Sequence, residues 1–474
     1  MKTKSIALAI AFTALSLNAQ VVVPMPKSGP YPTVNLGKPN EFKLKNGLTV
    51  IVVENHKLPR VSAQLMIDNL PFALGVKKGT ESLLGSMLGT GTKSISKDNF
   101  NKRIEFLGAS VNFQENGASA VSLSKYFNEV FNYMADGALN PDFTEKEFVN
   151  IKNRYIESLK GNDRSVEKIA SRVGGILVYG KKHPFAEYDS PEQIEKITLQ
   201  DVKDYYNTYY KPNNAYLVVI GDISVKEIKT LAEKNFNSWK AGEIFIPALP
   251  KVPEVTKTVI NAINMPNAVQ SDVSVRYPVY LTKKDPDYYA AIIASSVLGG
   301  GFNSKLNMNL REAHGWTYGA GGGVKESRYI GRFYANATVR NEVTAPAIVE
   351  TIKEIKGMTI NKIDQQTLDD VKAKLSGNFI LELEKPETTA HLTLIKKTDQ
   401  LPDDFYANHV RSINAVTIDD VLRVSKKYFR PEQALINITG KIEQIAPDLE
   451  KLGYPVIYYD SLGNKTEKPI PRVK

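Results

Sequence analysis

The 474-residue chain contains no cysteine. It therefore has no disulfide, no thiolate nucleophile and no cysteine-ligated metal, and its stability must come from the large core that this length supplies. After the first 20 residues no stretch reaches the roughly 18 apolar residues that a membrane-spanning helix needs. We therefore expect no stable membrane insertion.

Three chemistries lack their sequence motifs. The chain has no Gly-x-x-x-x-Gly-Lys loop for phosphoryl transfer and no Gly-x-Ser-x-Gly nucleophile elbow. Its histidines are never three or four residues apart, so no local pair can hold a metal, and we expect each of them in a loop or on the surface. The five histidines are His56, His183, His314, His391 and His409.

The charge is positive but dispersed. The formal net charge is +10, and it becomes +8 (10 − 2) without the two lysines of the first 19 residues. The lysines are scattered, with no run of five, which argues against nucleic acid as a partner. A lysine-rich solvated surface and an acidic partner protein both fit this balance.

The first 19 residues have the pattern of a cleavable signal peptide. Lys2 and Lys4 precede an apolar stretch from Ile6 to Leu17, and the small residue Ala19 ends the segment. No cysteine follows for a lipid anchor. We therefore expect a periplasmic or secreted protein.

The remaining chain contains an internal repeat. Residues 194–223 align with residues 413–442 without a gap and share nine identities. Both segments predict a Thr-capped helix, a turn at Lys/Arg-Pro and a buried strand ending in glycine. Each half must therefore carry the same α+β unit. The identities include Thr198/Thr417, Asp201/Asp420, Pro212/Pro431 and Gly221/Gly440.

The fold class that follows is α+β, with two homologous halves, each an antiparallel or mixed sheet packed with helices. Alternation predicts a hairpin over residues 46–69, and amphipathic patterns predict long helices over 144–161 and 362–385. Residues 240–256 hold three prolines without a helical pattern, as a linker does.

The two halves are therefore bounded by this linker. The N-terminal domain is expected at residues 20–239 and the C-terminal domain at 257–474.

Residues 79–92, GTESLLGSMLGTGT, predict a helix with two unequal faces. Two glycines inside a helix cost about 1 kcal/mol each relative to alanine, so the small face needs a reason. The apolar stripe is Leu83, Leu84, Met87 and Leu88, and the small face is Ser82, Gly85, Ser86 and Gly89.

Several phrases resemble the insulinase/pitrilysin family of zinc peptidases, in its bacterial branch related to mitochondrial processing peptidase. They span nearly the whole mature chain, and the family implies a clam-like duplicated fold. The phrases are NGLTVIVVENHKLPRVS, the segment at 79–92, HPFAEYDSPEQIEKIT, KPNNAYLVVIGDI and LGGGFNSKLNMNLREAHGWTYGAGG.

Active members of that family place His-x-x-Glu-His on this helix, where two imidazoles bind zinc and the glutamate is the general base. In this chain those positions are Ser82, Gly85 and Ser86, and Arg154 or Tyr155 stands where the third ligand is expected. The resemblance thus implies a metal site with its ligands removed and no zinc in this chain. Small residues also let a neighbouring strand approach closely, and both explanations can hold.

The second half keeps residues of the family's site. Gly315 predicts a helix C-cap and residues 316–318 an extended start of the next strand, so Arg311 and Tyr318 can face one cleft. The resemblance implies that such a pair approaches zinc from the opposite half, with the phenol donating to the oxyanion and the guanidinium holding the peptide. A helix-end arginine also suits the helix dipole, and the chain has 23 tyrosines.

A glycine-rich segment, Gly299, Gly300 and Gly301, precedes this pair. The resemblance implies substrate binding there, as on the non-catalytic subunit of mitochondrial processing peptidase. A tight turn after a helix explains the same glycines.

The predicted function is a non-catalytic subunit of a heterodimeric exported zinc metallopeptidase that cleaves peptides. A homologous partner would carry His-x-x-Glu-His and the zinc, and this chain would supply Arg311 and Tyr318 and no cofactor. The alternative is a peptidase-derived structural or peptide-binding protein with no proteolytic role. A self-sufficient enzyme would need a nucleophile–base pair, which the sequence does not show.

Overall fold

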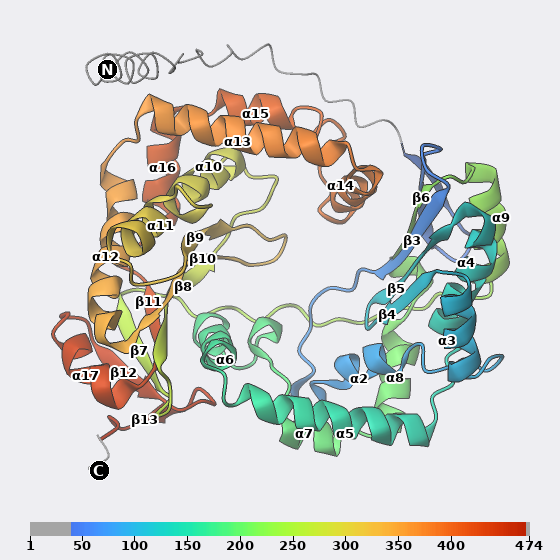
Figure 1. The fold of residues 1–474 in the computed structure, drawn as a ribbon, viewed down its shortest axis with the longest axis horizontal. Coiled ribbons are helices and arrows are strands. Elements are labelled where there is room, and N and C mark those ends of the chain that lie inside the picture. Colours follow the sequence, from blue (N-terminus) through green and yellow to red (C-terminus); the bar gives the residue numbers. More distant parts are fainter. Residues whose placement is uncertain (1–38, 471–474) are drawn as a thin grey trace, which may run out of the picture. The chain divides into compact units, whose positions relative to one another are not determined.

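The computed structural model describes residues 39–470, so the signal peptide predicted at residues 1–19 lies outside the described residues. The described strands form two sheets built on one plan, with helices packed on them (Figure 1). This confirms the predicted α+β class with two homologous halves. Every helix in the described part is too short or too polar to serve as a membrane span.

The spatial order of the strands differs from their order in the chain in both sheets. The first sheet runs β1 (Asn40–Lys43), β2 (Thr49–Glu54), β6 (Ala215–Gly221), β3 (Arg60–Ile67), β5 (Gly117–Leu123) and β4 (Ser110–Gln114). The second runs β13 (Lys465–Thr466), β12 (Val456–Tyr459), β7 (Val259–Asn264), β11 (Leu435–Gly440), β8 (Gln270–Val279), β10 (Gly331–Arg340) and β9 (Ala320–Lys325).

The strand that ends each repeat lies in the middle of its sheet. β6 pairs parallel to β2 and antiparallel to β3, and β11 pairs in the same two senses with β7 and β8. The hairpin predicted over residues 46–69 is therefore wrong, because β2 and β3 pair with β6 and not with each other. β6 is buried along nearly its whole length, as a strand covered on both faces must be.

The helices begin at conventional capping residues. Thr198 and Asp201 form a capping box at the start of one helix, and Thr417 and Asp420 form the equivalent box in the second half. The long helices predicted over 144–161 and 362–385 are confirmed within a few residues, and residues 240–256 contain neither helix nor strand.

The α-helices of the two halves have the following bounds. In the first half they are α2 (Thr80–Met87), α3 (Lys97–Phe106), α4 (Ser124–Leu139), α5 (Glu145–Asn162), α6 (Val166–Tyr179), α7 (Pro191–Lys196), α8 (Leu199–Tyr209) and α9 (Val225–Phe236). In the second they are α10 (Tyr288–Gly299), α11 (Lys305–Asn307), α12 (Thr344–Ile360), α13 (Gln365–Leu383), α14 (Pro386–Thr398), α15 (His409–Ala415), α16 (Ile418–Tyr428) and α17 (Ile442–Glu450).

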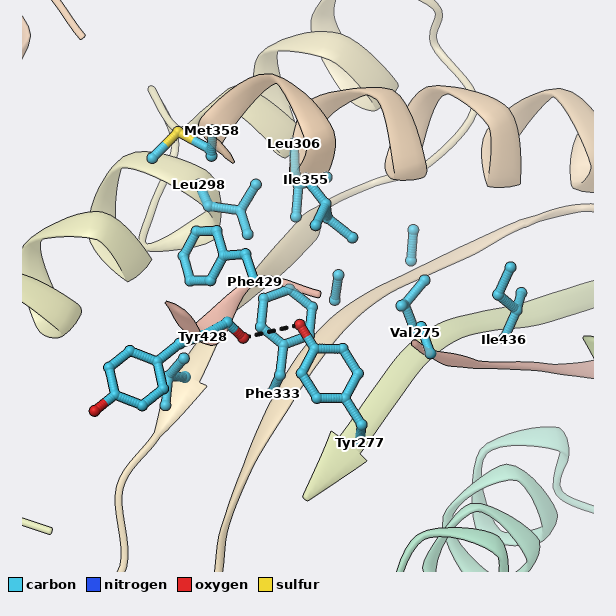
Figure 2. Close-up of a cluster of buried hydrophobic side chains, with 14 of the residues drawn as sticks. Val275, Tyr277, Leu298, Leu306, Phe333, Ile355, Met358, Tyr428, Phe429 and Ile436 are labelled. Carbon is cyan, nitrogen blue, oxygen red and sulfur yellow. Dashed lines mark hydrogen bonds between the residues drawn. The ribbon is translucent and has the colours of Figure 1, made fainter. Parts of the chain in front are cut away.

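Each sheet has its own apolar core. In the second half, Tyr277 stacks on Phe333 with ring centroids 4.8 Å apart, and Phe429 packs edge-on against the same Phe333 ring (Figure 2). The fully buried Tyr277 hydroxyl donates to the Tyr428 carbonyl at 3.0 Å and accepts from the Arg430 amide at 2.6 Å. The one polar atom of this ring is thereby satisfied, so its burial stabilises the core.

The halves exchange one helix each. α14, from the second half, packs on β2 and β6, where its Ala390 and Leu394 contact an apolar sheet face that includes Ile51 and Val218. α6, from the first half, packs on β8 and β11. The two halves are thus joined by contacts on both sheets.

The sheet face beneath α6 is polar. Asp272, Ser274 and Arg276 alternate along β8 toward this helix, and the Arg276 guanidinium lies where a side chain at Gly174 of α6 would stand. Burial raises the pKa of Asp272 to about 6, against the opposing effect of Arg276. α14 therefore packs on an apolar sheet face, whereas α6 packs on a polar one.

A buried carboxylate at the start of α10 joins this helix to α16. Asp287 accepts from Arg423 at 2.5 Å, from Lys427 at 2.7 Å and from Tyr428 at 3.0 Å. Burial acts to raise the pKa of Asp287, but the hydrogen bonds from Lys427, Arg423 and Tyr428 prevail and lower it from 3.8 to about 2.

The pKa of Asp287 is lower in the folded state than in the unfolded state. Asp287 therefore adds to the free energy of unfolding above the unfolded-state pKa, and this contribution is lost as the pH falls through the folded-state pKa. By linkage, wild type should lose about 1 kcal/mol more unfolding free energy than Asp287→Asn between about pH 5 and pH 3. Urea unfolding at both pH values measures this. Asp448→Asn, in an exposed pair with Lys451, is the matched control and should follow wild type. Equal losses in wild type and Asp287→Asn would contradict the assignment.

Candidate functional site

The helix predicted at residues 79–92, where the resemblance implies the zinc motif, is α2, and it is shorter than predicted. It ends at Met87 and not at residue 92, because Gly89 (φ +81°) and Gly91 (φ +119°) adopt left-handed backbone that a helix cannot contain. The predicted apolar stripe is confirmed, since all four members are at most 4% exposed. They are Leu83, Leu84, Met87 and Leu88.

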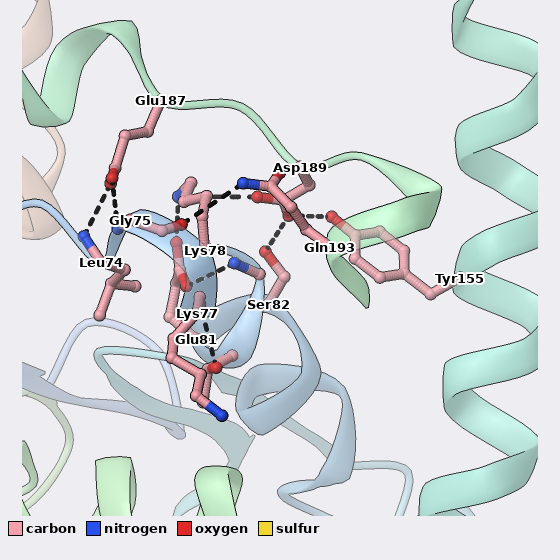
Figure 3. Close-up of polar contacts among 12 residues, drawn as sticks. Leu74, Gly75, Lys77, Lys78, Glu81, Ser82, Tyr155, Glu187, Asp189 and Gln193 are labelled. Carbon is pink, nitrogen blue, oxygen red and sulfur yellow. Dashed lines mark hydrogen bonds and ion pairs between the residues drawn. The ribbon is translucent and has the colours of Figure 1, made fainter. Parts of the chain in front are cut away.

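Ser82 is tied into a network of hydrogen bonds. Its hydroxyl donates to Asp189 Oδ2 at 2.7 Å, and the Tyr155 hydroxyl, reaching from α5, donates to the same oxygen (Figure 3). Of the two residues aligned with the third zinc ligand, Tyr155 therefore faces α2, whereas Arg154 is exposed. Burial and the bond to Asp189 raise the pKa of the Tyr155 phenol, which stays a donor.

The charges beside this network are paired. Lys78 forms an ion pair with Glu81, and its ammonium lies 3.7 Å from Asp189 Oδ1. Burial raises the pKa of Glu81 despite the opposing effect of Lys78. Glu187 accepts from the amides of Leu74 and Gly75, which anchors the loop that leads into α2 (Figure 3).

The position of the family's general base is closed by backbone. A Cβ added at Gly85 would lie 2.9 Å from the amide nitrogen of Glu115, in the turn between β4 and β5. Ser86 is exposed, and its hydroxyl donates back to the Ser82 carbonyl at 3.0 Å. Of the two explanations left open for the small face, close approach of a neighbouring segment, here a turn, therefore accounts for Gly85.

The chemistry open to this face is limited. In the part of the chain that the structure describes, Ser82 donates to a carboxylate to which no imidazole is bonded, so Ser82 has no base of the kind that a serine nucleophile requires. Within residues 39–470 no three His, Cys, Asp or Glu side chains gather as metal ligands. His183 lies in a bend, as the loop expectation allows, and its fully buried ring stacks on Tyr179.

Arg311 lies in a π-helical turn, η4 (Met308–Ala313), that continues from α11. Its guanidinium sits over the Phe302 ring at 4.9 Å, and its Nε lies 3.4 Å from the neighbouring Glu312 carboxylate. Gly315, at φ +61°, follows the helix end as predicted for a C-cap glycine.

Tyr318 is 93% exposed and has no hydrogen bond within the described part of the chain. It lies in a bend, and the next strand, β9, begins only at Ala320, so the extended start predicted at 316–318 is wrong. The Trp316 ring instead stacks on the His314 ring, with centroids 4.0 Å apart. Among the described residues no hydrogen bond joins Arg311 to Tyr318, so a shared role for the pair stays a prediction.

The glycine-rich segment has packing constraints of its own. Gly299 ends α10 beside Gly322 of β9, and a Cβ on Gly299 would lie 2.0 Å from the Gly322 amide nitrogen. Gly301 has φ +149°, and the Gly300 carbonyl accepts from Lys374 at 2.7 Å. These contacts account for the glycines, and substrate binding by Gly299, Gly300 and Gly301 stays a prediction.

Sequence reasoning did not identify the two residues that close the α2 face. Asp189 precedes a helix-capping serine, and Glu115 lies in a short turn. Both patterns are typical of ordinary loops, so neither signals a partner on α2.

Alanine at Gly85 tests this close approach. A methyl group there meets backbone, whose displacement costs about 1–3 kcal/mol, and the gain of about 1 kcal/mol in helix propensity offsets only part of this. We expect Gly85→Ala to lower the unfolding free energy by about 1 kcal/mol in urea titrations. Ser86→Ala, one position along on the exposed face, should change it little. If Gly85→Ala were more stable than wild type, the β4–β5 turn would have to move away at little cost, and close approach would not explain Gly85.

Known proteins share this arrangement. Residues 196–375 match the family model described as the peptidase M16 inactive domain. The chain is 23% identical over 435 residues to the zinc protease PqqE of Helicobacter pylori, covering 84% of this chain and 92% of that protein. It is 22% identical over 391 residues to the non-peptidase homolog YmxG of the same bacterium, covering 80% of this chain and 86% of that protein.

A solved structure of the peptidase M16 inactive domain from Pseudomonas fluorescens has the same fold. It superposes with a TM-score of 0.76 at 22% identity, over 85% of this chain and 97% of that one. These matches confirm the resemblance to the insulinase/pitrilysin peptidases, which form family M16. The chain is an M16-like peptidase homologue, and Ser82, Gly85 and Ser86 stand where the resemblance implies the zinc motif.

Proposed function

We propose that this chain is the non-catalytic subunit of a two-chain zinc peptidase. The observation that carries the proposal is the contrast between its two halves. The zinc face of α2 is closed by Asp189, Tyr155 and the Glu115 backbone, whereas Tyr318 projects into solvent without a partner in the described chain. A protein that retains only the second half of a site needs a partner to supply the first.

The partner we propose is a homologous subunit that carries His-x-x-Glu-His and zinc. Its zinc-bound water would attack the peptide, and this chain would add Tyr318 as a hydrogen-bond donor to the oxyanion and Arg311 to hold the peptide backbone. One bacterium, Helicobacter pylori, encodes both a zinc protease and a non-peptidase homologue that resemble this chain. Such a pair supports a division of labour between two chains.

We also propose that the complex works outside the cytoplasm. The basic, apolar and small-residue pattern of residues 1–19 supports export through a cleavable signal peptide. The absence of cysteine makes the folded chain indifferent to an oxidising compartment.

Purification of the tagged chain from its native cell envelope tests the partnership. We expect a second chain of similar size, about one zinc per pair and peptide cleavage that a chelator abolishes. A zinc-free, inactive eluate would contradict the proposal and would favour a peptide-binding protein derived from a peptidase.

Substitutions at the second-half residues test their roles in the purified complex. Tyr318→Phe removes only an exposed hydroxyl, so folding should be unaffected, while loss of an oxyanion donor should lower the turnover about 10²-fold. Arg311→Ala should lower activity without weakening assembly. Tyr280→Phe and Arg164→Ala, also exposed, are the matched controls and should retain activity. Unchanged turnover in both test variants would remove Arg311 and Tyr318 from the mechanism.

A further inference from the structure

A cavity of about 390 Å³ lies beside α2, whose Glu81 is part of its lining. Its walls come from the chain that follows β3, from the β4–β5 turn, from α8 and from the loop before β10. This volume lies within the range of about 300–1,000 Å³ that is usual for ligand sites. None of the roles proposed above uses it.

One wall of the cavity is aromatic. Phe72 stacks on Tyr209 with ring centroids 4.4 Å apart, and Tyr205 lies 4.9 Å from Tyr209. All three residues line the cavity. The faces of such rings carry partial negative charge and attract cations.

The lining also contains three carboxylates, and they differ in how they are neutralised. The Asp68 carboxylate accepts hydrogen bonds from both terminal guanidinium nitrogens of Arg328, and Glu81 forms an ion pair with Lys78. Glu115 is exposed and has no hydrogen bond or ion pair within residues 39–470. Burial raises the pKa of Tyr205, and the charges of Glu81 and Glu115 raise it further, as expected for a region of negative potential.

The lining also includes Tyr210, whose hydroxyl is buried. Tyr210 is 4% exposed, and its hydroxyl has no hydrogen-bond partner in the described part of the chain. An unsatisfied buried hydroxyl costs about 1–3 kcal/mol.

We propose that this cavity binds the basic side chain, arginine or lysine, of a peptide. The aliphatic stem would lie against Phe72 and Tyr205, and the cationic head would pair with the Glu115 carboxylate. Arginine suits the site best, because its planar guanidinium stacks on aromatic rings while its remaining N–H groups reach further acceptors. That a peptide supplies the cation rests on the proposed function, whereas the preference for a basic group rests on the cavity alone.

Calorimetric titration of the full chain tests the cavity with two small probes. N-acetyl-arginine methylamide carries the cation, and N-acetyl-citrulline methylamide is a neutral probe of almost the same shape. We expect saturable binding of the arginine probe, weakened by salt, and at least tenfold weaker binding of the citrulline probe. Equal binding of the two probes, or no saturable binding of the arginine probe, would overturn the proposal.

Glu115→Gln locates the site. Glu115 is exposed and bonded to nothing else in residues 39–470, so the variant should fold as wild type does and bind the arginine probe about tenfold more weakly. Glu105→Gln, an exposed carboxylate on α3, is the matched control and should bind as wild type does. Wild-type affinity in Glu115→Gln would overturn the assignment. Since these titrations use the chain without a partner, failure of the two-chain proposal leaves their outcome unaffected.

Discussion

The central strand of each sheet is the constraint on which the rest of the structure depends. β6 and β11 end their repeats, yet each inserts between two strands from the start of its half. No sheet is complete until that strand arrives, because its two neighbours are not paired with each other. The long-range pairing also places the segments after β3 and before β6 at one end of the sheet, where α2, Asp189 and the cavity meet.

The exchanged helices show that the repeat has diverged in its packing chemistry. α14 covers an apolar face, where buried surface itself provides the stabilisation. α6 covers a face on which Asp272 Oδ1, Ser274 Oγ and Thr439 Oγ1 are buried and lack protein partners among the described residues. Buried polar atoms contribute stability only when they are bonded, so this contact depends on water or on close adjustment of α6. The two halves therefore share a strand topology, but the contacts that hold the exchanged helix on each sheet are of different kinds.

The small face of α2 shows what surrounds the positions where the resemblance implies a zinc motif. The Asp189 carboxylate bonds two hydroxyls, and a turn closes against Gly85. Both sets of contacts are ordinary packing, and they leave Ser82 and Gly85 engaged with other parts of the first half. The cavity beside α2 is aromatic and acidic, and Glu115 belongs to both places, since its backbone and carboxylate lie against Gly85 and the residue also lines the cavity.

The sequence by itself determined the features that are local. Hydrophobic periodicity identified the buried stripe of α2, and the sequence identified Thr198 and Thr417 as helix caps, because each feature depends on residues within one or two turns of the chain. Tertiary structure alone decided that β6 separates β2 from β3, that Tyr155 and not Arg154 faces α2, and that Glu115 closes on Gly85. These outcomes arise from contacts between segments far apart in the chain, and no local pattern of residues encodes which distant backbone will arrive.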